Sequence, residues 1–297
     1  MDVAVSGSTG LIGSALVDAL GRAGHQVRRL VRVPPSAPDQ VLWNPTSGPI
    51  DLDGLRGVEA VVHLAGEGIQ NHRWSPEQKR RIRESRVDAT ARLASALASL
   101  DPRPKVLLSG SAIGFYGDRG DEELDETMGV GRGFLAEVSE DWEAACRPAI
   151  DAGIRVVNLR TGVVLTRNGG ALAKQLPLFR LGLGGRVGSG RQWLSWISLA
   201  DEIGAILHLL DADISGPVNL TAPEPVTNAA FAHALGRALH RPAILPIPSF
   251  APKLVLGSEL VESLLLSSAK VLPRRLSNVG YTFRHPTLDE AFADLLA

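Results

Sequence analysis

The chain has little of what disulfide-stapled, membrane-spanning or nucleic-acid-binding proteins need. Its 297 residues include one cysteine, Cys146, which excludes an internal disulfide and a cysteine-rich metal site. No apolar run reaches the roughly 18 residues of a membrane-spanning helix. Lysine plus arginine number 31 and aspartate plus glutamate 32, so no net positive field favours nucleic acid or an anionic bilayer. The start at Met1-Asp2 lacks a basic and apolar leader, and we expect a cytoplasmic protein.

What is present is typical of a globular protein. Hydrophobic residues make up 44% of the chain and charged residues 21%, values that exclude disorder as an overall description. A chain of this length can form one large domain with a smaller lobe, and two large independent domains would be crowded.

The first thirty residues predict a βαβ unit that binds a dinucleotide. A strand, a helix and a second strand are expected at 2–6, 11–23 and 26–31. Gly7, Gly10 and Gly13 join the first strand to the helix, where glycine lets backbone N–H groups approach a pyrophosphate at the positive helix end. The alternative is a tight turn without a ligand. Because the glycines follow a strand and open a helix within one βαβ unit, dinucleotide binding is the favoured interpretation.

The rest of the chain continues to alternate strands and helices. Further strands are expected at 58–64, 105–109, 155–159 and 218–220, and further helices at 76–98, 134–152, 199–210 and 228–239. This alternation predicts an α/β fold, a Rossmann-type doubly wound parallel sheet with a small C-terminal lobe. We expect an NADP-binding domain over 1–165, with sheet elements continuing at about 199–221, and substrate-side segments and the lobe over 166–297.

The end of the second strand favours NADP(H) over NAD(H). NAD-binding proteins of this class usually carry an acid there to bond the ribose 2′-hydroxyl, whereas a cation suits a 2′-phosphate. This strand ends Arg28-Arg29-Leu30-Val31-Arg32 and contains no acid. Arg32 is the expected phosphate ligand, because a guanidinium pairs with phosphate in bidentate geometry. The alternative is that these arginines are solvated surface charges.

Segments spread over essentially the whole chain match one family. They are Ser6-Gly-Ser-Thr-Gly-Leu-Ile-Gly13, Leu64-Ala-Gly-Glu67, Ser85-Arg86, Ser109-Gly-Ser-Ala-Ile-Gly-Phe-Tyr-Gly117, Asp141-Trp-Glu143, Arg160-Thr-Gly-Val-Val-Leu165 and 193–201. The chain here resembles the extended short-chain dehydrogenase/reductase superfamily, and within it the atypical epimerase-like family often labelled sugar-nucleotide epimerase or cell-division inhibitor. Its tail, at 253–257 and 272–276, looks like that family's C-terminal domain of unknown function.

The resemblance and the glycine turn together imply which residues contact NADP. These are Gly7, Thr9, Gly10, Leu11, Ile12, Gly13, Arg32, Leu64, Ala65, Gly66, Arg86 and Ser109, with Val163 near the nicotinamide end. Arg86 has a competing interpretation, because most cations on its helix should form a solvated face. His63, on an apolar strand, is expected to be a structural residue with a hydrogen-bonded ring.

Tyrosine is scarce, and the superfamily's usual acid/base pair is missing. Ordinary members use Tyr-x-x-x-Lys, in which the lysine lowers the tyrosine pKa. Tyr116 and Tyr281 are the only tyrosines, and Gly120 and His285 stand four residues after them. As replacements we expect Ser111 to polarise a substrate carbonyl and Tyr116 to supply a proton. The alternative for Tyr116 is a packed aromatic with a hydrogen-bonded hydroxyl.

A glycine-rich segment over 188–197 adds an arginine and two indoles. Arg191 would hold a phosphate or carboxylate of a substrate, and Trp196 would stack on a planar group. The alternative for this segment is core and turn.

Two further pairs are expected to carry no chemistry. Glu137 and Asp141 lie four apart on one predicted helix face, and a solvated face explains them better than an acid/base pair. His233 and His240 have no third ligand in the sequence, so no metal site is expected.

Two functions remain at this stage. The first is an NADP(H)-dependent oxidoreductase or epimerase acting on a small polar substrate, a carbonyl compound or a nucleotide sugar. The second is a non-catalytic NADP(H)-binding sensor or partner-binding protein, which the missing Tyr-Lys pair supports. The sequence does not indicate an oligomeric state.

Overall fold

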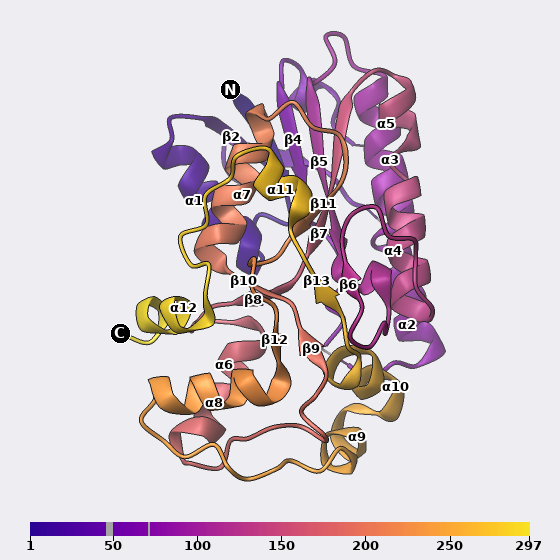
Figure 1. The fold of residues 1–297 in the computed structure, drawn as a ribbon. Helices are drawn as coiled ribbons and strands as arrows, with labels where there is room; N and C mark the ends of the chain where they lie inside the picture. The colour runs from indigo at the N-terminus through magenta and orange to yellow at the C-terminus, as the bar shows by residue number, and fades with distance from the viewer. Residues whose placement is uncertain (46–49, 71) are drawn as a thin grey trace.

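A seven-stranded parallel sheet forms the centre of the molecule (Figure 1). The computed structural model describes residues 1–45, 50–70 and 72–297. In spatial order the strands are β11 (Gly216–Leu220), β7 (Arg155–Thr161), β5 (Val106–Ala112), β4 (Ala60–His63), β1 (Asp2–Ser6), β2 (Gln26–Val31) and β3 (Gln40–Leu42). Their connections leave β1 first toward β2 and β3, and then toward β4, β5, β7 and β11. The order reverses between β1 and β4, where this class of sheet binds ligands at the carboxyl ends of its strands.

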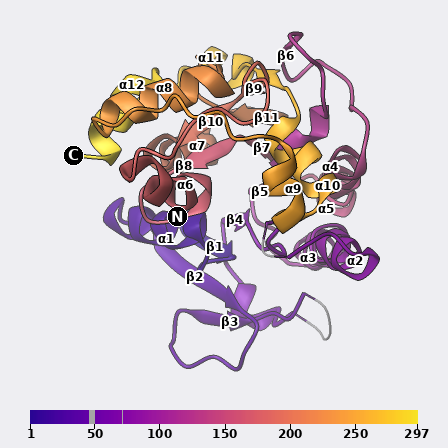
Figure 2. The same ribbon diagram turned by 90° about the horizontal axis from the view of Figure 1, so that it is seen from below.

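Helices cover both faces of the sheet, as seen from below in Figure 2. One face carries α1 (Leu11–Arg22) and α7 (Leu199–Asp211), and the other carries α2 (Pro76–Glu84), α3 (Val87–Ala98), α4 (Phe134–Ala144) and α5 (Arg147–Asp151). Each face has its own apolar core because the buried strands place alternate side chains on opposite sides. This arrangement confirms the predicted doubly wound α/β fold.

Most of the remaining elements lie below the carboxyl edge of the sheet in the view of Figure 1, whereas α11 lies higher, beside β11. The helices are α6 (Gly170–Arg180), α8 (Asn228–Ala238), α9 (Phe250–Leu256), α10 (Ser258–Val261), α11 (Arg274–Asn278) and α12 (Leu288–Leu295). The paired short strands are β8 (Val163–Leu165) with β10 (Trp196–Ser198), β9 (Trp193–Leu194) with β12 (Val226–Thr227), and β6 (Glu123–Leu124) with β13 (Lys270–Val271). Single turns η1 (Asp53–Leu55), η2 (Ile113–Tyr116) and η3 (Glu262–Leu266) complete the fold. No helix in the ranges described above is long and apolar enough to cross a membrane.

Two helices predicted as continuous are broken. The helix expected at 134–152 ends at Ala144, because Pro148 lacks an N–H and its ring clashes with the carbonyl four residues earlier. The helix expected at 76–98 breaks at Ser85 and Arg86. There the Ser85 hydroxyl donates to the Ile82 carbonyl (3.0 Å), an alternative to the helical ladder. The second break places Arg86 at the start of α3.

Candidate functional site

The glycine turn after β1 is as tight as the sequence predicts. Gly7 has φ +68°, a conformation that side chains rarely adopt, and a Cβ there would lie 2.8 Å from the Leu64 backbone. A Cβ on Gly13 would lie 2.1 Å from the Gly7 carbonyl oxygen. The first turn of α1 therefore packs directly against the end of β1.

Exchanging Gly13 for alanine should lower the free energy of unfolding by about 1–3 kcal/mol, because the added methyl group forces the turn and α1 apart. Urea unfolding followed by circular dichroism measures the loss. Gly21→Ala is the matched control on the same helix, since a Cβ there meets nothing within 4 Å. It should raise stability by about 0.5–1 kcal/mol. Equal effects of both variants would contradict the packing described here.

The N-terminus of α1 has no side chain to cap it. Gly10 is the N-cap, whereas Ser75 and Ser198 cap α2 and α7 by accepting hydrogen bonds from backbone N–H groups. The first backbone N–H groups of α1 are therefore left for an external acceptor, and the helix dipole favours an anion there. Thr9 is exposed beside this end, and Leu11 is half-buried against the loop that precedes α6.

The three arginines of β2 and its end differ in their partners. Arg28 forms a salt bridge with Asp2, and Arg29 forms a bidentate pair with Asp39 (2.6 and 2.9 Å). Arg32 is exposed and has no hydrogen-bond or ion-pair partner in the part of the chain that the structure describes. The solvated-charge alternative thus does not hold for Arg28 and Arg29, and Arg32 alone keeps its donors available.

Arg86 is half-buried and forms no salt bridge among the described residues. Its guanidinium donates to the carbonyls of Glu67 (2.9 Å) and Ile82 (3.3 Å), lies over the Trp142 ring and borders Gly66. Burial lowers its pKa to about 10. An anion next to Gly66 would compensate this charge.

The cations of α2 itself lie on the expected solvated face, where each is paired with an acid. They are Lys79, Arg80, Arg81 and Arg83, which pair with Glu259, Glu77, Glu84 and Asp141. Asp141 is ion-paired with Arg83, and Glu137 is exposed on the same helix. This carboxylate pair therefore fits the solvated-face interpretation.

A buried hydrogen-bond chain fixes the end of β4. The Ser6 hydroxyl accepts the N–H groups of Leu64 (3.1 Å) and Ala65 (3.3 Å) and is hydrogen-bonded to His63 Nδ1 (2.6 Å). The opposite ring nitrogen bonds Thr90 Oγ1 (2.9 Å). Burial lowers the pKa of His63 to about 4, so its ring is neutral at physiological pH. His63 thus has the structural setting predicted for it, and it orients the small residues at the strand end.

A second buried network lies at the ends of β5 and β7. Ser111 Oγ donates to Glu143 Oε1 (2.7 Å), and Glu143 forms a bidentate pair with Arg160 (2.7 and 2.8 Å). Arg160 also donates to the Tyr116 hydroxyl (3.0 Å), which donates to Asn219 Oδ1 (2.8 Å). Neither Glu143 nor Arg160 was assigned a role from the sequence, although both lie in matched segments. Their pairing joins residues 17 apart on different elements, which no local pattern reports.

Tyr116 has no solvent-exposed surface. Its hydroxyl is committed to two partners, and burial raises its pKa, a shift that Arg160 only partly offsets. No lysine is among these partners. The structure favours the packed-aromatic alternative for Tyr116, whereas the Ser111 hydroxyl stands at the carboxyl edge of the sheet.

The two predicted substrate residues, Arg191 and Trp196, differ in their exposure to solvent. Trp196 is fully buried in the core beneath α8, with its indole N–H donating to the Glu224 carbonyl (3.1 Å). It offers no surface to a ligand, so the core alternative accounts for it. Trp193 is the indole that remains half-exposed, and it bonds Asp121 (2.8 Å). Arg191 is exposed, and its guanidinium has no partner among the described residues.

The remaining predicted cofactor residues also lie near this edge. Val163 is half-buried just after β7, and Ser109 is buried within β5, where its side chain faces the interior. Taken together, the predicted cofactor residues follow the ends of β1, β2 and β4, or lie in the first turn of α1, within β5, at the start of α3 and at the start of β8.

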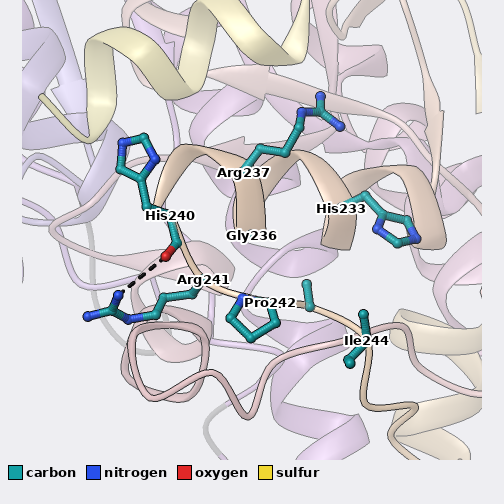
Figure 3. Close-up of a pocket in the computed structure, with 8 residues that line it drawn as sticks. His233, Gly236, Arg237, His240, Arg241, Pro242 and Ile244 are labelled. Atoms are coloured by element: carbon teal, nitrogen blue, oxygen red, sulfur yellow. Dashed lines mark hydrogen bonds between the residues drawn. The ribbon is translucent and has the colours of Figure 1, made fainter.

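A hollow of about 650 Å³ lies elsewhere, at the end of α8 (Figure 3). His233, Arg237, His240 and Arg241 line it, and none of the predicted cofactor residues does. Arg237 is paired with Asp289, and Arg241 donates to the carbonyls of Arg180 and His240. Across the described ranges, no three His, Cys, Asp or Glu side chains are grouped to hold a metal ion.

Comparison with known proteins agrees with this architecture. The model of the NAD dependent epimerase/dehydratase family matches residues 3–221, and a domain of unknown function (DUF1731) matches residues 247–295. An epimerase family protein of Mycobacterium bovis is 47% identical over 290 residues, covering 97% of this chain and 95% of its own length. The human epimerase family protein SDR39U1 is 37% identical over 301 residues and covers both chains completely.

Solved structures give the same result. The crystal structure of human SDR39U1 (isoform 2) with NADPH has a TM-score of 0.90 and 36% identity, covering 99% of each chain. A nucleoside-diphosphate sugar epimerase from Corynebacterium glutamicum has a TM-score of 0.81 and 39% identity, covering all of this chain and 58% of that one. On sequence and structure alike, this chain belongs to the NAD dependent epimerase/dehydratase family.

Proposed function

We propose that this protein binds NADP(H) along the carboxyl edge of its sheet and transfers hydride to or from a small polar carbonyl or nucleotide-sugar substrate, as an oxidoreductase or an epimerase. The observation that carries the proposal is the combination of an uncapped glycine turn with Arg32 left free at the end of β2. The relative crystallised with NADPH supports it.

Each part of the cofactor has residues that suit its chemistry. The turn from Gly7 through Gly13 offers backbone N–H groups to the pyrophosphate, and Arg32 offers its guanidinium to the 2′-phosphate. Arg86, a desolvated cation whose charge the nearby Glu67 carboxylate offsets only in part, supplies a second positive charge beside Gly66. Ser6 fixes the backbone of Leu64 and Ala65 by accepting their N–H groups, and the cofactor would pass along this segment.

NADP(H) supplies the hydride in such a reaction, and the protein supplies binding and orientation. The Ser111 hydroxyl lies at the carboxyl edge and is our candidate to polarise a substrate carbonyl, for which its proton would turn from Glu143 to the substrate oxygen. Arg191 stands on the exposed glycine-rich segment with free donors for a substrate phosphate or carboxylate.

A second candidate is a protein that binds NADP(H) without catalysis. The fully buried Tyr116 favours this candidate, because among the described residues its hydroxyl is bonded to Asn219 and Arg160 and not to a lysine. Incubation with a panel of carbonyl compounds and sugar nucleotides distinguishes the two functions. Stoichiometric oxidation of bound NADPH supports the enzyme. Silence, together with a partner protein captured only in the presence of cofactor, supports the binding protein.

Substituting Arg32 with alanine should weaken NADPH binding about 10- to 100-fold and leave NADH binding unchanged, because only NADPH carries the 2′-phosphate. Fluorescence titration, checked by calorimetry, gives both dissociation constants. Arg22→Ala removes the same charge from the far end of α1, where Arg22 is exposed, and serves as the control. Unchanged NADPH affinity in Arg32→Ala would refute the assignment.

A further inference from the structure

Glu202 is a buried carboxyl that the proposed function does not use. It lies in the first turns of α7, and its side chain has no exposed surface. One oxygen accepts the hydroxyl of Thr161 (2.9 Å), and the other, Oε2, has no hydrogen-bond partner. Buried polar atoms are nearly always paired, so an unpaired carboxyl oxygen calls for a functional explanation.

The position of Glu202 relates it to the cofactor path. Its partner Thr161 is the last residue of β7 and lies beside Ala112, the last residue of β5. Arg32 and the glycine turn assign the adenosine half of the dinucleotide to β1 and β2. The nicotinamide half therefore extends the other way, over β4, β5 and β7. The hydrogen bond to Thr161 therefore connects Glu202 to the carboxyl end of β7, over which the nicotinamide half is inferred to lie.

Glu202 forms no salt bridge with a cation in the part of the chain that the structure describes. Within the described ranges, β5, β8 and β10 contribute no titratable side chain against α7, and Asp18 and Arg22 of α1 are exposed. Arg160 of β7 is engaged with Glu143. The acids near Glu202 are Tyr281 and the adjacent Asp201, which are bonded to each other (3.0 Å). The basic side chains that pack around α7 are engaged elsewhere: His285 lies 3.6 Å from Asp201, His208 packs on the Tyr281 ring, and Arg155 donates to carbonyls at the far end of α7. Burial raises the pKa of Glu202 to about 8, so the carboxyl is neutral at physiological pH.

We propose that Glu202 links a proton to the oxidation state of the nicotinamide, keeping its proton beside the neutral dihydronicotinamide of NADPH and releasing it beside the cationic ring of NADP⁺. This inference rests on the proposed function. Its physical basis is that a positive ring behind Thr161 stabilises the carboxylate in a low-dielectric surrounding, whereas a neutral ring does not. NADP⁺ binding then releases a proton from Glu202 Oε to solvent, and NADPH binding does not. Glu202 is thereby a residue that sets the preference between oxidised and reduced cofactor.

The test compares the affinities of NADP⁺ and NADPH for the whole protein between about pH 6.5 and 9.5, a range centred on the Glu202 pKa. The ratio of the two affinities is used because the 2′-phosphate titrates alike in both nucleotides. In the wild type the ratio should move toward NADP⁺ by about tenfold with rising pH, the change expected for a one-unit shift in the pKa of one group. In Glu202→Gln, which keeps an acceptor for Thr161, the ratio should be constant.

Two controls make the result specific. Glu126→Gln changes another buried carboxyl whose pKa is raised by burial, but Glu126 bonds the backbone of Asn219 in β11, and this variant should keep the pH dependence. Infrared difference spectra should show a protonated carboxyl lost on adding NADP⁺ to the wild type, and no such loss with NADPH or in Glu202→Gln. Glu202→Leu, whose side chain has no ionisable group, serves as a second variant.

The outcomes separate this inference from the function beneath it. If both nucleotides bind with a ratio that does not change with pH, or if Glu202→Gln keeps the dependence, the Glu202 proposal is overturned and NADP(H) binding stands. If neither nucleotide binds, the proposed function fails and the proposal fails with it.

Discussion

Replacing Glu143 with alanine should lower the free energy of unfolding by about 3–5 kcal/mol. Glu143 is the only carboxylate that pairs with Arg160 in the described part of the chain, and the Arg160 side chain is 4% exposed. Without Glu143 the guanidinium keeps its charge in a site with almost no water. Its contact with the Phe115 ring, 3.5 Å from the ring centre, cannot replace two charge-assisted hydrogen bonds. Urea unfolding at neutral pH measures the change.

An exposed pair provides the control for this result. Arg147 and Asp151 are joined at 2.6 Å on α5, and both side chains are more than half exposed. Removing Asp151 should therefore change stability by less than about 1 kcal/mol. Replacing both members of the buried pair, as Glu143→Leu with Arg160→Met, should recover much of the stability lost by Glu143→Ala. Equal effects of the buried and exposed truncations would show that solvent reaches Arg160.

Between pH 5 and pH 8.5 the free energy of unfolding of the Glu202→Gln apoprotein should rise, relative to that of the wild type, by about 4 kcal/mol. The folded protein holds the Glu202 proton up to a pKa of about 8, whereas the unfolded chain releases it near the ordinary value of 4.5. Between these values the folded state binds more protons, so wild-type stability falls with rising pH. Glutamine does not titrate, and the difference between the two unfolding curves isolates the carboxyl.

The sign distinguishes Glu202 from His63. The pKa of buried His63 is lowered to about 4, so the unfolded state binds more protons between that value and 6.5. Stability from His63 is therefore present above about pH 6.5 and is lost as pH falls toward 4. If unfolding curves of the wild type and Glu202→Gln run parallel from pH 5 to pH 8.5, the Glu202 carboxyl is not buried in its neutral form.

Much of the fold and of the cofactor edge was predictable because its signals are local. The glycine spacing, the apolar strands and the capping residues each lie within a few positions, and the structure has β1, α1 and β2 where they were expected. Arg32 was likewise singled out from its place at a strand end, and its contact with the 2′-phosphate stays a prediction. The helix breaks at Ser85 and Pro148 were also local, but their effect depends on side-chain hydrogen bonding and ring contacts that apolar periodicity does not report.

The chemistry beyond the cofactor was not predictable in this way. Ser111, Glu143 and Arg160 lie on three elements, and only the packing of α4 against the sheet brings them together. Trp196 has the composition of a pocket wall, yet its burial was decided by α8 covering it. Glu202 stands at the start of an otherwise regular amphipathic helix, and its burial depends on contacts made by the other end of the chain.

The segment matched by the domain of unknown function is interleaved with the rest of the protein. Its β13 pairs with β6, its Leu276 belongs to the core beneath the central sheet, and its Phe292 packs on Phe231 of α8. The boundary of that sequence family, near residue 247, is consequently not a boundary between folding units. Gene fusion could not exchange this tail between Rossmann proteins as an independent unit, because the tail and the rest of the protein bury apolar side chains in the same cores.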